Sequence, residues 1–313
     1  MALTLSNSNY DGEALEQLYT VLSTGNEVGR KGAATVLPGI AKKKSIPKLS
    51  RSTRPIGTYT SGSPTSDTVT TTYAERSIEP KNMMVYEEFI PEEFFDVWKA
   101  FQSAGDFTNL ELNTTLLMAI LELYEDGIGE HLSELYFQGD TGSATPALAY
   151  FNGIITRAAA DANVVKPTPV GNITAGNFFD ILSAVWNAIP AKFIDDPDFK
   201  LMVNTTDYKL MQSANTSLKK DFVGVFGQSL ENMYQTNRIE HFSGMPQHHI
   251  LGAKVSASEA RSNLFLGVWV DPMNENVRVD RVANNSDEWF LRINLRADAN
   301  YREASEIVLY EPS

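Results

Sequence analysis

Residues 28–80 constrain this chain most, because the stretch holds too few large apolar side chains to close a core of its own. From Arg30 to Arg54 it carries eight basic residues and no acidic one. Single apolar residues nevertheless recur along it, at Ile46, Leu49, Ile56, Tyr59, Val69, Tyr73 and Ile78. Two interpretations stay open. The stretch is a disordered linker, or it is an arm and a hairpin that become ordered only on a neighbouring subunit, which the rest of the chain favours.

The basic stretch belongs to an otherwise acidic chain. The 313 residues carry a net charge of −13, and setting aside the eight positive charges leaves −21 on the remainder. An acidic body is poorly suited to gripping nucleic acid, since phosphate contacts need lysine and arginine. The same charge separation allows the arm of one copy to be attracted to the body of another.

Several classes of protein are disfavoured by composition. The chain has no cysteine, which excludes disulfides and thiolate chemistry. No apolar run approaches the roughly 18 residues of a membrane span, so we expect no membrane association. The first eight residues carry neither the basic nor the apolar region of a signal peptide, so we expect no secretion.

The N-terminal part contains signals for a helix and a hairpin. Leu15, Leu18, Tyr19 and Leu22 recur at helical spacing within residues 9–24, and Gly25 follows as a stop. Residues 56–60 and 68–73 are rich in threonine, tyrosine and valine and flank a Ser/Gly/Pro turn, which predicts two paired strands. A lone two-stranded hairpin is marginal in water, so this one needs a surface to lie on.

A long helix is the clearest element of the body. Thr108 and Glu111 form a capping box, and apolar residues at helical spacing continue to Gly139, which predicts a helix over 108–138. At ~1.5 Å per residue it is roughly 45 Å long. Gly127 and Gly129 inside it cost ~1 kcal/mol each relative to alanine, and allow bending or the close approach of another backbone.

A short helix is predicted just before the long one, and a second module after it. Pro91 suits the first turn of the short helix, with Glu92 and Glu93 near its positive end. After a boundary at residues 164–171, the pattern predicts a helix over 178–189 that ends at Pro190, and then a buried strand over 199–203. A capped helix is predicted over 204–214 and another buried strand over 264–270. The β-rich tail is predicted to hold strands at 276–282, 288–295 and 305–310. The class is α+β.

No motif in the sequence carries chemistry. His131, His241, His248 and His249 are the only histidines, and the adjacent pair would point to opposite faces of a strand. The acidic run 195–198 lacks the glycine and the distal glutamate of a calcium loop. Ser217–Lys220 matches S-x-x-K without the partner motifs of penicillin-recognising enzymes. We therefore expect no catalytic residue, metal or cofactor, and no enzymatic activity.

The order of the elements carries a resemblance that no single motif does. A basic arm and a hairpin lead into a short acidic helix, a long helix, a small-residue segment and a helix–strand–helix module. The pieces that mark this order are Phe137–Asp140, Phe151–Ile155, Val203–Thr206, Gly244–Pro246, Arg292–Asp298 and Ile307–Tyr310. The set resembles the major capsid proteins of tailed bacteriophages, which have the Hong Kong ninety-seven type fold.

The resemblance covers nearly the whole chain and implies a division into parts. Residues 1–54 correspond to an N-terminal helix and basic arm, and 55–80 to the extended loop, a β-hairpin. Residues 81–167 correspond to a peripheral domain, with residues 108–138 as its spine helix. Residues 168–278 correspond to an axial domain, and residues 279–313 to a β-rich return to the peripheral domain. Two departures matter: no long scaffolding segment precedes the arm, and 55–80 contains no lysine, which puts an isopeptide cross-link from that loop in doubt.

The resemblance also implies function and partners. We expect a virion capsid protein, made in the bacterial host cytoplasm, that assembles as hexamers and pentamers into an icosahedral shell around double-stranded DNA, without sequence-specific contacts. A portal is a further expected partner, as are scaffold or decoration proteins. The residues expected to touch a neighbouring subunit are Arg30, Lys31, Lys42, Lys43, Lys44, Lys48, Arg51, Arg54, Tyr59, Tyr73, Glu87, Glu88, Glu92 and Glu93.

Two other functions stay open on the sequence alone. An encapsulin-like nanocompartment shell shares the fold and differs in what it encloses. A soluble hydrolase or ligand-binding protein with a disordered N-terminus belongs to another class. Closed shells are expected only of the two shell-forming alternatives.

Overall fold

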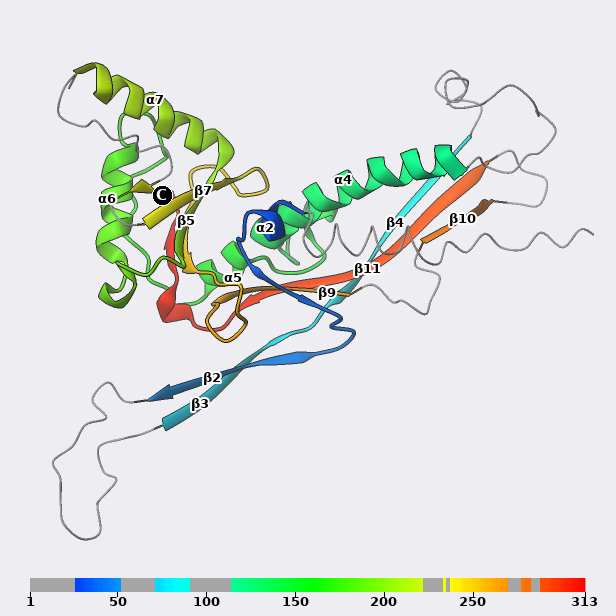
Figure 1. The fold of residues 1–313 in the computed structure, drawn as a ribbon, viewed down its shortest axis with the longest axis horizontal. Coiled ribbons are helices and arrows are strands. Elements are labelled where there is room, and N and C mark those ends of the chain that lie inside the picture. The colour runs from blue at the N-terminus through cyan, green and yellow to red at the C-terminus, as the bar shows by residue number, and fades with distance from the viewer. Residues whose placement is uncertain are drawn as a thin grey trace, which may run out of the picture.

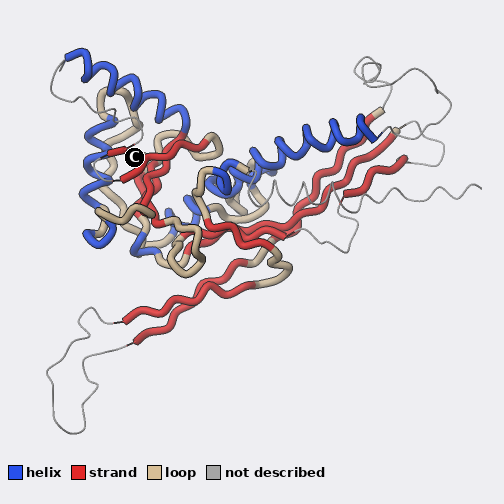
Figure 2. Tube along the Cα trace, in the orientation of Figure 1, coloured by secondary structure: helices blue, strands red, loops and turns tan. Residues whose placement is uncertain are grey.

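The computed structural model describes residues 26–51, 71–90, 114–221, 233–234, 237–269, 277–282 and 288–312. In these residues helices and strands are mixed, and the described strands form two five-stranded sheets and one two-stranded ladder. The molecule is elongated, with one sheet and a long helix extending to one side and the second sheet with its helices at the other end (Figures 1 and 2).

The first sheet is built around one long strand, β11 (Trp289–Tyr301). Its neighbours are β4 (Lys81–Phe89) along one side, β10 (Val277–Arg281) and β9 (Leu264–Trp269) along the other, and β1 (Thr35–Pro38) parallel to β9. Side chains alternate between the two faces of a strand. Leu291, Ile293, Leu295 and Ala297 of β11 accordingly share one face and lie in the main core.

The long helix, α4 (Thr114–Gln138), lies along this sheet (Figure 1). Ile128, Leu132 and Leu135 follow helical spacing and are buried in the same core as the inward residues of β11. The helix ends at Gln138, and the Gly139 N–H donates to Leu135 O at 2.9 Å, so the predicted stop is confirmed. The predicted start at Thr108 lies outside the described residues.

The second sheet has the order β12-β8-β5-β7-β6. Its strands are β12 (Val308–Tyr310), β8 (Ile250–Lys254), β5 (Phe199–Asn204), β7 (Asn237–Phe242) and β6 (Met233–Tyr234). Two helices, α6 (Phe178–Ala188) and α7 (Thr205–Asp221), accompany it, and α6 supplies Phe178, Ile181, Leu182 and Val185 to a second core. The predicted helix before Pro190 and the buried strand at 199–203 are confirmed.

Short elements lie between the longer ones along the chain. They are α2 (Glu27–Arg30), α5 (Ile154–Ala160) and the 3₁₀ helices η3 (Pro146–Leu148), η4 (Ala191–Phe193) and η5 (Ala304–Glu306). The loop after β7 lies directly against α4, where Gln138 Nε2 donates to Gly244 O at 2.8 Å. Asn204, at the end of β5, donates through Nδ2 to Met245 O and accepts from Thr206 N at 2.7 Å. The predicted cap at Asn204 is therefore confirmed, and the same residue holds the loop.

The hairpin ladder is formed by β2 (Lys44–Arg51) and β3 (Thr71–Ile78). The strands are antiparallel, with Lys44 opposite Ile78, and they extend away from the body (Figure 1). At the body end, Ile46 and Ile78 are fully buried, in a cluster completed by Leu37, Ile40 and Phe265 of the same chain.

This cluster gives the root of the hairpin a partner surface in its own chain, where the sequence suggested a surface on a neighbouring subunit. Within the described part of residues 28–80, Val28, Ala33 and Leu37 are also buried against the chain's own body. Composition did not indicate this surface, because β1 joins the first sheet through pairing with β9, more than 200 residues later. Sparse apolar residues suffice when the partner surface already exists in the same chain.

The hairpin strands differ from the predicted ones. The predicted first strand, 56–60, lies outside the described residues, and β2 instead falls within the predicted arm. The predicted second strand, 68–73, overlaps β3, which continues to Ile78. Residues 44–51 and 74–78 mix charged and small side chains, so β propensity gives little signal there.

Two strands pair with distant parts of the chain. β9 lies in the first sheet and β12 lies in the second sheet, while the predicted division into parts stays a prediction. Within 305–310, η5 replaces the start of the predicted strand. Long-range pairing decides these positions, and no local pattern reports it.

Two glycines of this region predict opposite effects when changed to alanine. A Cβ at Gly244 would lie 2.6 Å from Glu134 N, too close to backbone to relax easily, whereas a Cβ at exposed Gly127 of α4 meets nothing within 4 Å. We expect Gly244→Ala to destabilise the chain by about 1–3 kcal/mol and Gly127→Ala to stabilise it by up to ~1 kcal/mol. Urea unfolding of the unassembled chain measures both, and equal effects would contradict the packing at Gly244.

Candidate assembly surface

Three basic residues predicted to touch a neighbour have partners in their own chain. Lys31 Nζ donates to Glu27 Oε1 at 2.8 Å and to His241 O at 2.5 Å. Lys44 Nζ lies 3.1 Å from Glu259 Oε1, and Lys48 is paired with Glu303. These contacts hold the N-terminal segment on the body of the same molecule, which the charge pattern alone did not indicate.

Glu27 is the centre of the first of these contacts. Its Oε2 accepts from Ser243 N at 2.8 Å and from Ser243 Oγ at 2.6 Å, in the loop after β7. Burial acts to raise the pKa of Glu27, but the hydrogen bonds from Lys31 and Ser243 outweigh it and lower the pKa. The carboxylate is thus held ionised and ties α2 to the second sheet.

Arg30, Lys42 and Lys43 are the other basic arm residues whose side chains the structure describes. All three are exposed, and none has a salt bridge within the described ranges. Lys42 and Lys43 lie together in the connection between β1 and β2, at the root of the hairpin. They are the described arm residues best placed to meet an acidic surface of another molecule.

The other predicted contact residues divide into two groups. Glu87 and Glu88 are exposed on β4 rather than leading into a helix, and Glu88 Oε1 accepts from Tyr86 Oη at 2.6 Å. The side chain of Arg51 and the whole of Arg54, Tyr59, Glu92 and Glu93 lie outside the described residues. Their contact role stays a prediction.

Polar contacts fix the base of the hairpin above the buried isoleucines. Arg76 Nη2 donates to Asp161 Oδ2 at 2.6 Å, and the Arg76 guanidinium lies 4.2 Å from the ring centroid of Tyr301. Tyr301 Oη donates to the same Asp161 oxygen at 2.9 Å, and Asn300 Nδ2 donates to Ser77 O at 2.7 Å. Backbone and side chain of β3 are therefore both anchored, so its direction is set by the body.

Further along β3 the side chains have no such cover. Tyr73 is 63% exposed, and Thr72, Ala74 and Glu75 are exposed beside it. The Tyr73 hydroxyl donates to Glu75 Oε2 at 3.0 Å, which leaves the ring itself in solvent. The predicted contact residue Tyr73 is thus an aromatic side chain on a projecting strand, a geometry suited to binding another surface.

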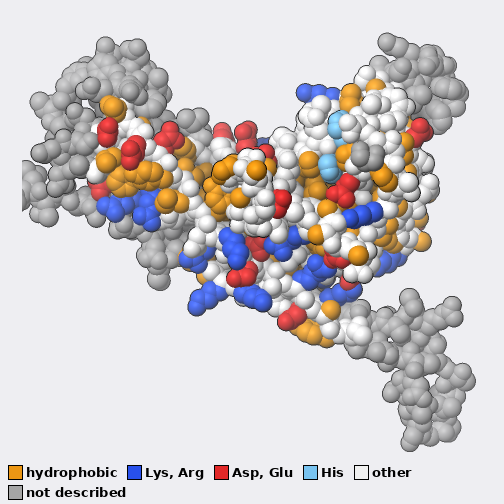
Figure 3. Space-filling view, turned by 180° about the vertical axis from the view of Figure 1, so that it is seen from behind, with side chains coloured by type: hydrophobic (Ala, Val, Ile, Leu, Met, Phe, Trp, Pro, Cys, Tyr) orange, Lys and Arg blue, Asp and Glu red, His pale blue; other side chains and the backbone are white. Residues whose placement is uncertain are grey.

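A second exposed apolar surface lies on β4. Met83 and Val85 face the main core, whereas Met84 is 53% exposed and Tyr86 48% exposed on the opposite face, where Tyr86 stacks on Phe290 with ring centroids 5.8 Å apart. From behind, apolar patches among lysine and arginine clusters are visible on the molecule (Figure 3). This exposed face was not predicted. Residues 83–86 are apolar on both faces of the strand, a pattern typical of a strand that is covered on both sides.

The histidines have structural surroundings. His131 Nε2 lies 2.8 Å from Ala147 O, and the His241 ring stacks on Tyr208 with centroids 4.7 Å apart. His248 has a φ of 63°, and its N–H donates to Asp207 Oδ2 at 2.6 Å. Burial raises the pKa of Asp207. Within the described ranges no three metal-ligating side chains come together, and no helix there is long and apolar enough to cross a membrane.

The whole fold is similar to solved shell structures. A chain of the satellite phage P4 procapsid matches with a TM-score of 0.56 and 13% identity, over 95% of this chain and 98% of that one. The capsid of the empty GTA particle matches at 0.57 and 14%, over 100% and 95%. The virus-like particle from Pyrococcus furiosus matches at 0.50 and 12%, over 96% and 100%. The chain has the α+β fold of phage major capsid proteins.

The similarity in fold is not accompanied by a detectable similarity in sequence. No protein-family model matches the chain, and a search of the curated proteins finds no similar sequence.

The Arg76–Asp161 contact predicts a pH-dependent loss of stability in one variant. The hydrogen bond from Arg76 holds the pKa of Asp161 well below its ordinary value. A lowered folded-state pKa adds stability that is present above the unfolded value of about 3.9 and is lost as pH falls through the folded value. After allowance for solvent screening, Asp161→Asn should therefore lower the free energy of unfolding by about 1 kcal/mol at pH 7. Below pH 4 the loss should become progressively smaller.

Urea unfolding of the unassembled chain at pH 7, 5 and 3 measures this difference. Asp195→Asn, at an exposed position after η4, is the matched control and should change little at any pH. The ion pair is contradicted if the free energies of unfolding of the wild type and of Asp161→Asn differ by the same amount from pH 7 to pH 3.

Proposed function

We propose that this chain is the major capsid protein of a tailed phage, which self-assembles into an icosahedral shell around double-stranded DNA. The observation that carries the proposal is the likeness over nearly the full length of both chains to phage and particle capsid structures. A match of that coverage includes the projecting hairpin and the long helix, so the elements that extend beyond the compact core are part of the similarity.

The exposed surfaces support an assembling protein. The hairpin presents Tyr73 beyond the body, and the face of β4 presents Met84 and Tyr86. Interfaces of obligate assemblies commonly bury 2,000–5,000 Å² or more. At ~25 cal/mol per Å² of apolar area, covering surfaces of that size yields tens of kcal/mol in gross terms, offset by the loss of translational freedom and side-chain ordering.

Within this proposal, Lys42 and Lys43 supply the electrostatic part of the contact between copies. The body of the chain is strongly acidic, and these two lysines are exposed at the root of the hairpin. A partner surface that includes Glu87 and Glu88 of another copy fits their charge. We assign hexamers and pentamers, a portal, and scaffold or decoration proteins to the same proposal, with synthesis in the host cytoplasm.

A nanocompartment shell is the second candidate, and one observation favours it: the likeness to the virus-like particle from Pyrococcus furiosus, at a TM-score of 0.50. The likeness to the phage procapsid is higher, at 0.56. The two functions differ in content, DNA in one and a protein cargo in the other. Neighbouring genes for a portal and a terminase would indicate the phage, and a cargo enzyme the compartment.

Electron microscopy of the purified, concentrated protein tests the proposal directly. We expect closed icosahedral particles formed by the chain alone or with a co-expressed scaffold, and nuclease-protected double-stranded DNA in particles recovered from infected or induced cells. Particles that hold a folded protein cargo and no DNA would identify the compartment instead. A chain that stays monomeric under all these conditions contradicts both shell functions.

The lysine pair predicts a charge-dependent assembly. Lys42→Glu together with Lys43→Glu should leave the chain folded and soluble while raising the protein concentration needed for assembly at least tenfold. Lys42→Arg with Lys43→Arg keeps the charge and should assemble normally. Raising salt should weaken wild-type assembly, because exposed charges are screened beyond ~8–10 Å at 0.1–0.15 M salt. Light scattering against concentration measures both, and normal assembly of the double glutamate variant refutes the role of the pair.

A further inference from the structure

His241 lies where the second sheet meets α2. Its ring, on β7, stacks on Tyr208 of α7 with centroids 4.7 Å apart. Lys31, the C-cap of α2, places its Nζ 3.3 Å from His241 Nδ1 while it donates to His241 O. Thr205 Oγ1 lies 3.3 Å from the same Nδ1. Groups from α2 and α7 therefore meet at one nitrogen of this imidazole.

The lysine decides which nitrogen of the ring can carry a proton. An ammonium group is a donor only, so the Nδ1 that faces it keeps its lone pair, and the proton of the neutral ring lies on Nε2. A proton added to Nδ1 would place two positive charges 3.3 Å apart. Burial and the charge of Lys31 both act to lower the pKa of His241, in line with this geometry.

The other charged groups near His241 offset the lysine only in part. Glu27 of α2 and Glu240 of β7 act to raise the pKa of His241, but burial and Lys31 outweigh them. Glu27 is itself engaged by Lys31, at 2.8 Å. Lys200 of β5, whose Nζ donates to Lys31 O at 3.3 Å, brings a further positive charge to the same region. The surroundings as a whole favour the neutral ring.

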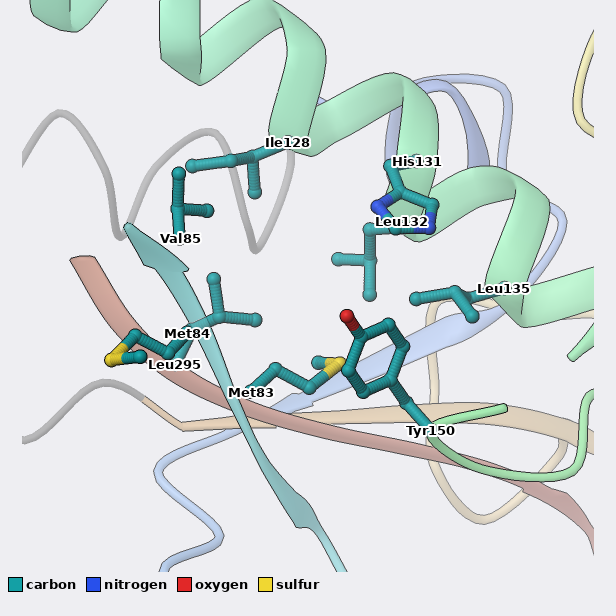
Figure 4. A pocket seen from close by; sticks show the side chains of 9 residues that line it. All are labelled: Met83, Met84, Val85, Ile128, His131, Leu132, Leu135, Tyr150 and Leu295. Carbon is teal, nitrogen blue, oxygen red and sulfur yellow. The ribbon is translucent and has the colours of Figure 1, made fainter. Parts of the chain in front are cut away.

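The other three histidines differ in what faces them. His131 lines an apolar groove between β4 and α4, whose lining has no lysine, arginine or carboxylate (Figure 4). Its Nε2 and the Nδ1 of His249 each lie within 2.8 Å of a backbone carbonyl oxygen, which accepts from a neutral or a charged ring. His248 Nδ1 lies 3.3 Å from a carboxylate oxygen of Asp207, a contact that a positive charge strengthens. Among the described residues, a lysine ammonium faces a ring nitrogen only at His241.

We propose that His241 is a pH-sensitive switch for α2: when the pH falls below about 6 its ring is protonated, repels Lys31 and loosens α2 from the second sheet. Lys31 links α2 to β7, and Glu27 links it to Ser243 in the loop that follows β7. Both links end within residues 241–243, so a charge on His241 acts where α2 is held. The switch works within a single molecule and goes beyond the proposed shell function.

The direction of the pH effect follows from the lowered pKa. The unfolded chain takes up this proton near pH 6.5 and the folded chain at a lower pH, so the stability is present above about pH 6.5 and is lost as the pH falls below it. His241→Asn removes the titration and keeps an acceptor, because its Oδ1 falls close to the place of Nδ1. Between pH 7.5 and pH 5 the unfolding equilibrium constant of the wild type should therefore rise at least about threefold relative to that of His241→Asn.

Two measurements on the full-length, unassembled chain test the switch. Urea unfolding across this pH range measures the difference in stability. Hydrogen exchange of residues 27–33, corrected for the intrinsic pH dependence of exchange, measures the loosening of α2 and should quicken at pH 5 in the wild type but not in His241→Asn. His249→Asn, whose ring faces a backbone carbonyl, is the matched control and should keep the wild-type behaviour in both.

Either of two results overturns the proposal. One is the same pH dependence of unfolding in the wild type and in His241→Asn. The other is exchange of residues 27–33 in the wild type that does not change between pH 7.5 and pH 5. If His241→Asn does not fold, Lys31→Met removes the opposing charge instead, and the loss of stability on acidification should shrink. An unchanged loss in that variant is equally decisive.

Discussion

The burial of Ile46 and Ile78 against Phe265 of the same chain is the contact on which the rest of the structure depends. It joins the start of β2 and the end of β3 to the first sheet, so the hairpin leaves the body from a fixed root. Gly267 makes room for it, since a Cβ there would lie 2.6 Å from Cγ2 of Ile78. Without this contact the ladder would be an isolated two-stranded hairpin, which is marginal in water.

Anchoring the root within one molecule changes the energetics of assembly. A hairpin that becomes ordered only on a partner subtracts its ordering cost from the binding free energy, whereas a preformed one does not. The Arg76–Asp161–Tyr301 contacts extend the anchor along β3, and the ion pairs of Lys31, Lys44 and Lys48 fix the segment before it. What remains for a partner is the exposed part: Tyr73, the Met84–Tyr86 face of β4, and the two lysines at the root.

The sequence was informative wherever a local pattern decides the structure. Gly139 stops α4, Asn204 caps α7, and a continuous apolar run marks β9, and each of these could be predicted because neighbouring residues in the chain carry the signal. The α+β class and the capsid fold followed from the order of such elements. Tyr73, Lys42 and Lys43 are exposed, and their contact with a neighbouring subunit stays a prediction.

The rest could not be predicted because distant segments determine it. Nothing near Leu37 indicates that β1 pairs with β9, and therefore nothing indicated that Lys44 meets Glu259 or that Lys48 meets Glu303. β12 joins the second sheet through β8, far from β11 that precedes it. Charge counting predicted an arm for other molecules, whereas Lys31, Lys44 and Lys48 form ion pairs with acidic residues of their own chain.

Amide hydrogen exchange of the dilute, unassembled chain tests the central claim most directly. Peptides covering Lys44–Lys48 and Ala74–Ile78 should exchange as slowly as those from β11, because the root of the hairpin is folded in a single molecule. Exchange there at the rate of an unstructured peptide, with protection appearing only after particles form, would mean that the hairpin is ordered by its neighbours and would contradict an anchor within one chain.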